Sequence, residues 1–185
     1  MEAVDTTARR YDGRTIFFHW LTLFLVVVQF AIAWTIDDFP RGPLRVDARS
    51  AHITIGAILA IVLVARLIWR ATRGRRLAAA DHGVLHVVAK GTHWGLYLLL
   101  LAMVSVGLFL AWTRGDSLFN VVTIPKFDPT NDDLRHQAQE LHATIGWVII
   151  GLVSLHGLAA IAHRVFWKDG VLSRMAPHAA PNAVL

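Results

Sequence analysis

Histidine is the residue type in this sequence whose positions most clearly indicate chemistry. The chain has ten histidines and no cysteine, and His142 and His156 lie 14 residues apart in one apolar stretch. On an α-helix this spacing corresponds to about 21 Å along the axis and about 40° around it, so both side chains share a face. An ionisable residue inside hydrocarbon is costly and indicates a functional site. The two imidazoles are therefore candidate metal ligands at two depths.

Four long apolar stretches contain or flank these histidines. Of the 185 residues, 55% are hydrophobic and 17% are charged, and each stretch is close to the roughly 20 residues that span a bilayer. A backbone inside lipid must satisfy its own hydrogen bonds, which favours helices. The sequence therefore predicts an all-α membrane protein, a four-helix bundle forming one domain over residues 1–185. The expected helices cover about 16–36, 51–69, 93–112 and 142–167.

The basic residues predict the orientation of the bundle. Twelve lysines and arginines lie on the side that holds both ends of the chain, and six lie on the other side. Loops in the cytoplasm carry the excess of positive charge, so both termini are expected there. The loop over 113–141 is then outside, and its part 132–141 is expected to form a short helix because long loops are rarely without structure.

The net charge of +5 does not indicate a nucleic-acid-binding protein. The basic residues are spread over every loop without interleaved aromatic residues, unlike a nucleic-acid-binding patch. Beside the ends of membrane helices they are expected to contact lipid headgroups. Membrane lipid, and no nucleic acid, is thus the expected surrounding of this chain.

The predicted topology arranges four histidines in two pairs. His19 and His156 lie near the inner membrane surface, and His52 and His142 lie near the outer surface. Bare zinc or copper needs three or four ligands in one small sphere, whereas haem supplies four nitrogens itself and needs two more. Without cysteine, covalent attachment through C-x-x-C-H is excluded. The four histidines are therefore expected to be the axial ligands of two non-covalent haems b.

A short repeat accompanies the outer pair. The pattern H-x-T-I-G occurs at His52–Gly56 and again at His142–Gly146. Each glycine lies one helical turn from its histidine on the same face, where it would leave room for a porphyrin. The alternative interpretation is close helix packing through small residues, with the histidines as interhelical hydrogen-bonding groups.

The remaining histidines give weaker indications. His93 and His163 could each replace a ligand of the inner haem. His163 is about 31 Å from His142 along a helix, so an acid–base role at the inner membrane surface suits it better. A role as a simple interfacial anchor is the alternative. Ordinary surface or loop positions are expected for His82, His86, His136 and His178.

Four segments share a recognisable pattern: Phe18-His19-Trp20-Leu21, Arg66-Leu-Ile-Trp-Arg70, Gly91-Thr-His93, and His142 to Asp169 with Gly146, Gly151, His156 and His163. With these segments, from about residue 14 to 175, the sequence resembles the bacterial cytochrome b561 family. The resemblance implies a four-helix inner-membrane protein with two haems b, held by His19 with His156 and by His52 with His142. The features nearest to members that oxidise superoxide and reduce ubiquinone are Arg114-Gly115, Ile124-Pro125 and the end at Trp167.

Three functions are compatible with these patterns. In the first, Arg114 and Lys126 attract superoxide at the periplasmic side, and its electrons pass through the haems to ubiquinone. His163 would protonate the quinone near the cytoplasmic side, with Arg66 and Arg164 binding its headgroup. In the second, the chain carries electrons between the quinone pool and a periplasmic redox protein that docks on the acidic outer loop. In the third, the histidines are structural or move protons, and no haem is bound.

Overall fold

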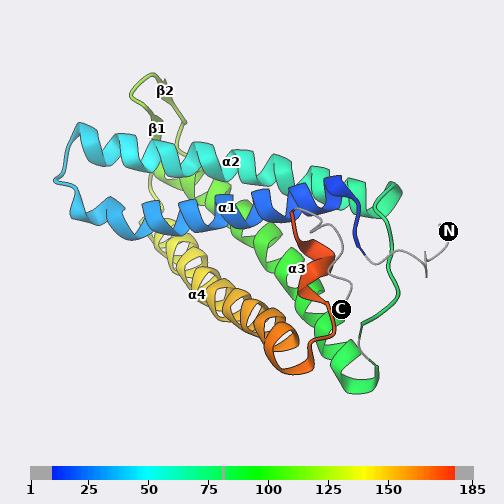
Figure 1. The fold of residues 1–185 in the computed structure, drawn as a ribbon. Helices are drawn as coiled ribbons and strands as arrows, with labels where there is room; N and C mark the ends of the chain where they lie inside the picture. The colour runs from blue at the N-terminus through cyan, green and yellow to red at the C-terminus, as the bar shows by residue number, and fades with distance from the viewer. Residues whose placement is uncertain (1–9, 81, 178–185) are drawn as a thin grey trace.

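Four long helices make up most of the protein (Figure 1). The computed structural model describes residues 10–80 and 82–177. All four helices are long and apolar enough to cross a membrane, so the predicted all-α membrane bundle is confirmed. Their bounds are α1 Gly13–Thr35, α2 Pro43–Thr72, α3 Gly83–Arg114 and α4 Asp132–Ala162, and a π-helical turn, His163–Trp167, continues α4.

Three of the helices begin well before the apolar stretches that indicate them. α2 begins at Pro43. Proline suits the first turn because the backbone N–H that it lacks would have no partner within the helix. α4 begins at Asp132, after the Asn131 side chain accepts a hydrogen bond from the Leu134 N–H as an N-cap. Residues 132–141, expected as a separate short helix, are thus the first part of α4. Polar turns thus extend these helices beyond their apolar parts, and in α4 the extension begins at a side-chain cap.

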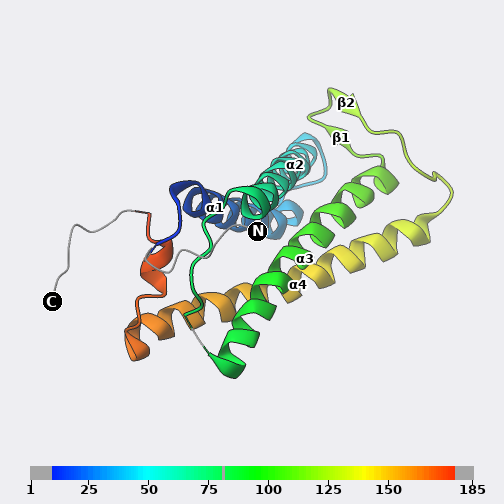
Figure 2. The ribbon, with the colours of Figure 1, turned by 90° about the vertical axis from the view of Figure 1, so that its right-hand side faces the viewer.

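The helices form two antiparallel pairs, α1 with α2 and α3 with α4, which meet mainly through α2 and α3. Figure 2 shows the two pairs crossing at an angle. Most large apolar side chains are exposed on the outside of the bundle, as lipid-facing residues are. The buried centre is purely aliphatic and draws on every helix: Leu25, Val26, Leu59, Leu63, Leu100 and Ile149.

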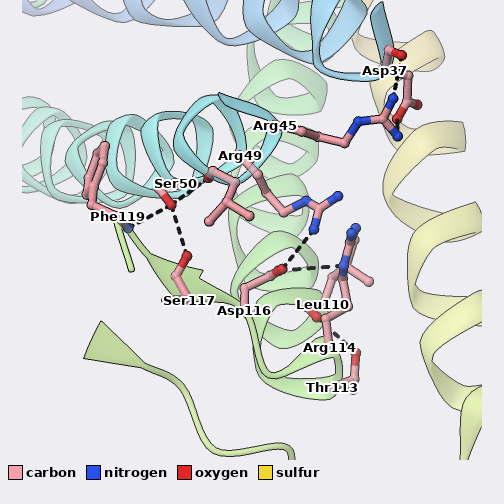
Figure 3. Close-up of polar contacts among 11 residues, drawn as sticks. Asp37, Arg45, Arg49, Ser50, Leu110, Thr113, Arg114, Asp116, Ser117 and Phe119 are labelled. Carbon is pink, nitrogen blue, oxygen red and sulfur yellow. Dashed lines mark hydrogen bonds and ion pairs between the residues drawn. The ribbon is translucent and has the colours of Figure 1, made fainter. Parts of the chain in front are cut away.

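A small hairpin in the long outer loop was not predicted from the sequence. Strands β1, Ser117–Leu118, and β2, Val122–Thr123, pair antiparallel. The hairpin is held to α2 by the fully buried Ser50, whose Oγ accepts from the Phe119 N–H at 2.9 Å and lies 2.9 Å from the Ser117 carbonyl (Figure 3). Strands of two residues are too short to produce a recognisable alternation of polar and apolar residues.

The two ends of the described chain meet on one side of the bundle. The Tyr11 N–H donates to the Arg174 carbonyl at 3.2 Å, and Trp20 Nε1 donates to the Met175 carbonyl at 2.8 Å. Arg174 in turn donates to the carbonyl of Ala78, in the connection between α2 and α3, at 2.8 Å. An even number of spans requires this arrangement.

Asp12 joins α1 to the end of α2 at this side. Its carboxylate accepts from the Thr15 N–H at 2.9 Å, from Trp69 Nε1 at 3.1 Å and from the Arg75 N–H at 3.0 Å. Burial raises the pKa of this carboxyl, but the hydrogen bonds outweigh burial and lower the pKa to about 2. Asp12 is therefore both the N-cap of α1 and a link between the first two helices.

Candidate functional site

The structure brings the four predicted ligand histidines together in pairs at two levels. The ring centroids of His52 and His142 lie 6.3 Å apart, and those of His19 and His156 also lie 6.3 Å apart. Ile149 lies seven residues from each of His142 and His156 on α4 and is 1% exposed. The aliphatic centre therefore separates an outer histidine pair from an inner one.

The spacing within each pair can be compared with what one iron atom requires. A metal–imidazole nitrogen bond is about 2 Å long, and the centre of a five-membered ring with bonds near 1.35 Å lies about 1.1 Å beyond that nitrogen. Two imidazoles on opposite sides of one iron therefore have centroids about 6 Å apart. Both 6.3 Å pairs fit this separation.

A third histidine lies at the inner level. His93 of α3 has its ring centroid 5.2 Å from that of His156, which is shorter than an intervening iron allows. His93 is also exposed at the edge of the cluster, whereas His19 and His156 are half-buried. The geometry favours His19 over His93 as the partner of His156.

The outer pair also has the unsatisfied polar atoms expected of a cofactor site. Among the described residues, the Nδ1 atoms of His52 and His142 and the Oε1 atom of Gln29 are buried without a hydrogen-bond partner. Such atoms are rare in folded proteins because each costs about 1–3 kcal/mol. A pair of buried imidazoles with a ring nitrogen that lacks a protein partner fits a site that holds a further group.

One glycine that the sequence did not single out lies against a proposed ligand. A Cβ on Gly107 of α3 would lie 2.9 Å from His142 Cε1, so only glycine lets the ring take this position. The glycines of the H-x-T-I-G repeat have other neighbours. A Cβ on Gly56 would meet the Gln29 side chain at 2.9 Å, and one on Gly146 would meet Met103 at 3.2 Å. These two glycines thus serve close helix packing, the alternative interpretation of the repeat.

A half-buried arginine contacts the inner pair. Arg66 Nη2 lies 3.1 Å from His19 Nδ1, and its guanidinium lies 5.1 Å from the centre of the Tyr97 ring. Guanidinium only donates, so Nδ1 of His19 is the acceptor in this arrangement. The aromatic face and the imidazole together stabilise a charge that would otherwise be costly at this depth.

His163 lies at the inner end of α4 and has an acidic partner. Its Nδ1 lies 2.5 Å from Asp169 Oδ2, and its ring packs against Trp167 with centroids 4.7 Å apart. Lys168, with φ of +49°, reverses the chain so that Asp169 folds back onto the histidine. Burial raises the pKa of Asp169, but hydrogen bonds from His163 and the Val171 N–H outweigh it and lower the pKa. Sequence reasoning missed this pair because it depends on a single turn.

The outer end of the bundle carries a polar pocket beyond the outer histidine pair. Its volume is about 290 Å³, and its charged lining consists of Arg49, Arg114, Arg135 and Asp116. Asp116 is 8% exposed and lies 3.4 Å from Arg49 Nη1 and 3.6 Å from Arg114 Nε (Figure 3). Lys126 lies beside the pocket, since a Cβ on Gly115 would be 2.5 Å from its Cγ. Arg114 and Lys126 are thus both at the outer end of the bundle, while His163 lies at the opposite end.

Comparison with known proteins agrees with this geometry. The family described as prokaryotic cytochrome b561 matches residues 10–178. A probable superoxide oxidase CybB of Yersinia pestis is 27% identical over 91% of this chain and 97% of its own length. The cytochrome b561 homologs 2 and 1 of Escherichia coli strain K12 are 29% and 27% identical, also over 91% of this chain, and over 92% and 97% of their own lengths.

Proposed function

This chain belongs to the prokaryotic cytochrome b561 family, and on that premise we propose that it oxidises superoxide outside the membrane and reduces ubiquinone near the inner surface. Binding of haem b and electron transfer in a multi-pass membrane protein follow from the family itself. The number of haems, the two substrates and the bacterial inner membrane as location are parts of the proposal.

The observation that supports this proposal most directly is the occurrence of two 6.3 Å histidine pairs at two depths. His52 with His142 would hold the outer haem, and His19 with His156 would hold the inner haem. Bound in this way, the two haems would supply one-electron redox chemistry at six-coordinate iron. The residues of the chain fix the distance between the two sites, and α4 contributes a ligand to both.

The outer residues would bring the anion to the membrane surface. Arg114 lines the outer pocket, and Lys126 lies against the neighbouring Gly115 at its edge. Positive charge there would raise the local concentration of an anion. Two superoxide anions would each lose one electron and leave as two molecules of dioxygen. Neither step needs a proton, so the outer residues have only to attract and position the anion.

The inner residues would complete the reduction of the quinone. One ubiquinone takes up the two electrons and two protons to become ubiquinol. His163, held by Asp169, would donate a proton to a quinone oxygen, because imidazole exchanges protons near neutral pH. Arg66 and Arg164, at the inner ends of α2 and α4, would bind the headgroup. The cytoplasm would then return the proton to His163 through the half-exposed Asp169.

A second function is favoured by the charge of the outer surface. Asp132, at the start of α4, has a side chain that is 73% exposed. Asp133 beside it is also exposed, and Asp128 in the same region is half-buried. Such a surface suits docking of a basic redox protein from the periplasm. In that case the chain would carry electrons between that protein and the quinone pool, without oxidising superoxide.

Rapid mixing of the purified protein with superoxide distinguishes the two functions. With ubiquinone present, we expect the haem α-band to appear on mixing and to decay as quinol forms, with two superoxide anions consumed per quinol. Oxidised protein mixed with buffer that contains superoxide dismutase is the control. An α-band that does not respond to superoxide, but is reduced by quinol, would instead support the carrier.

A further inference from the structure

Three arginines from three different helix ends converge on the outer pocket. Arg49 lies three residues outward from His52 on α2, and Arg135 lies seven residues outward from His142 on α4. These separations are about 4.5 Å and 10.5 Å along the axes, and seven residues return to within about 20° of the same face. Each arginine is thus placed just outside a histidine of the outer pair.

The third arginine has the same relationship to that pair. Arg114 lies seven residues outward from Gly107, the α3 residue against which the His142 ring packs. By the same helical repeat it lies about 10.5 Å outward on the face that meets the ring. The three arginines therefore line one pocket outward of the outer histidine pair.

The charge of the pocket is unbalanced. Its lining holds three arginines and one aspartate, a net charge of +2. Asp116 lies between Arg49 and Arg114 and forms an ion pair with each (Figure 3). Arg135 instead forms its ion pair with the exposed Asp132. Partly buried charge without a counter-ion is costly, and guanidinium binds carboxylates through paired hydrogen bonds. With Asp132 included, three guanidiniums face two carboxylates, so the pocket keeps an excess positive charge that a carboxylate ligand would neutralise.

Haem b carries two propionate carboxylates on one edge. We propose that Arg49, Arg114 and Arg135 bind the propionates of the outer haem, and that Asp116 holds two of these guanidiniums in position. This inference rests on the proposed outer haem between His52 and His142. It also divides the outer cations by role, because Arg114 would be neutralised by a propionate. Lys126 would then remain as the cation that attracts superoxide.

The decisive variant is Arg135→Gln, because Arg135 does not pair with the buried Asp116 and its loss leaves no buried charge alone. In the purified holoprotein, we expect the outer haem to transfer to excess apomyoglobin on the order of tenfold faster. A change of this size corresponds to the loss of one charge-assisted hydrogen bond. Its midpoint potential should fall, since a removed positive charge favours ferric iron. Arg135→Lys should restore the potential. Arg49→Gln and Arg114→Gln should act in the same direction.

Arg45→Gln is the matched control. Arg45 lies one turn from Arg49 on α2, but it bonds to Asp37 and to the Phe39 carbonyl instead of facing the pocket. It should change neither haem retention nor potential. Asp116→Asn provides an independent measurement, because it adds a net positive charge to the pocket and should raise the potential of the outer haem.

The inference is overturned if Arg135→Gln and Arg49→Gln leave haem transfer and potential unchanged, even if superoxide reacts more slowly. In that case the pocket binds only the substrate anion. His52→Ala separates this failure from failure of the proposed function. If that variant still holds every haem of the wild type, the proposed outer site is wrong and both fall. If it loses one haem while Arg135→Gln is silent, only the propionate assignment falls.

Discussion

The imidazoles of His93 and His156 approach to 5.2 Å, closer than the 6.3 Å between His19 and His156. An iron atom between two imidazoles needs about 6 Å, so only the second pair has room for one. We therefore expect His93→Ala to keep the inner haem and its low-spin spectrum. His19→Ala should lose that haem, so that haem content falls from two per chain to one by pyridine haemochrome analysis.

Each of these two variants serves as the control for the other, because both remove one histidine from the same cluster. Loss of the inner haem in His93→Ala, with retention in His19→Ala, would show that α3 and not α1 supplies the ligand.

Mutation of a histidine of the outer pair is expected to affect the outer haem and not the inner one. His52→Ala and His142→Ala should each remove the same haem and leave the inner haem with its own α-band and potential, since His142 and His156 lie 14 residues apart on α4 and the aliphatic core lies between the two levels. Redox titration of each variant measures this. Disappearance of different haems in the two variants would contradict the pairing.

Gly107 offers a test that leaves all ligands in place. Gly107→Ala puts a methyl group 2.9 Å from the present position of His142 Cε1, so the ring must move. We expect weaker retention and a shifted potential of the outer haem, with no change in the inner one. Gly151→Ala on α4, where nothing lies within 4 Å of the new methyl group, should be neutral or slightly stabilising. Equal behaviour of the two variants would mean that the His142 ring tolerates displacement.

The pair of His163 and Asp169 should govern reoxidation by quinone. His163→Ala is expected to leave haem content and reduction by superoxide intact while slowing reoxidation by ubiquinone on the order of 10²-fold, the usual contribution of a positioned proton donor. Asp169→Asn should have a smaller effect, because the histidine remains but loses its carboxylate. His86→Ala, which removes an exposed histidine of α3 on the same side, should have none. Stopped-flow spectroscopy of pre-reduced protein makes the comparison. Unchanged kinetics in His163→Ala would place quinone reduction elsewhere.

The hydrogen bonds of the Asp12 carboxylate at the inner end of the bundle are expected to be sensitive to acid. Its folded pKa of about 2 lies below the ordinary value of 3.8, so the ionised form stabilises the fold. That stabilisation is fully present above pH 4 and is lost as the pH falls from about 4 to 2. Asp12→Ala should lower the free energy of unfolding at neutral pH by about 1 kcal/mol, the usual value of an N-cap. The difference in Tm between variant and wild type should shrink over this pH range, and a constant difference would refute the assignment.

The number and nature of the membrane helices could be predicted because twenty apolar residues in a row have few alternatives in lipid. The histidine pairs followed from helical periodicity, which places residues 14 apart on one face. The helix ends could not be predicted from hydropathy, since Asn131 and Asp12 set them by capping. Asp116 and Asp169 were missed for a related reason. Each reaches its partner through a local turn, at Gly115 or at Lys168, that carries no periodic pattern.

The position of α4 has a consequence for the order of biogenesis. Both proposed haem sites take one ligand from α4, which is the last of the four helices to leave the ribosome. Residues 172–176, which contact α1 and the connection after α2, are synthesised later still. Neither site would therefore exist on a partly synthesised chain, even after α1, α2 and α3 have entered the bilayer. Cofactor loading would be confined to the finished bundle, and a chain arrested before α4 would hold no redox-active iron in the membrane.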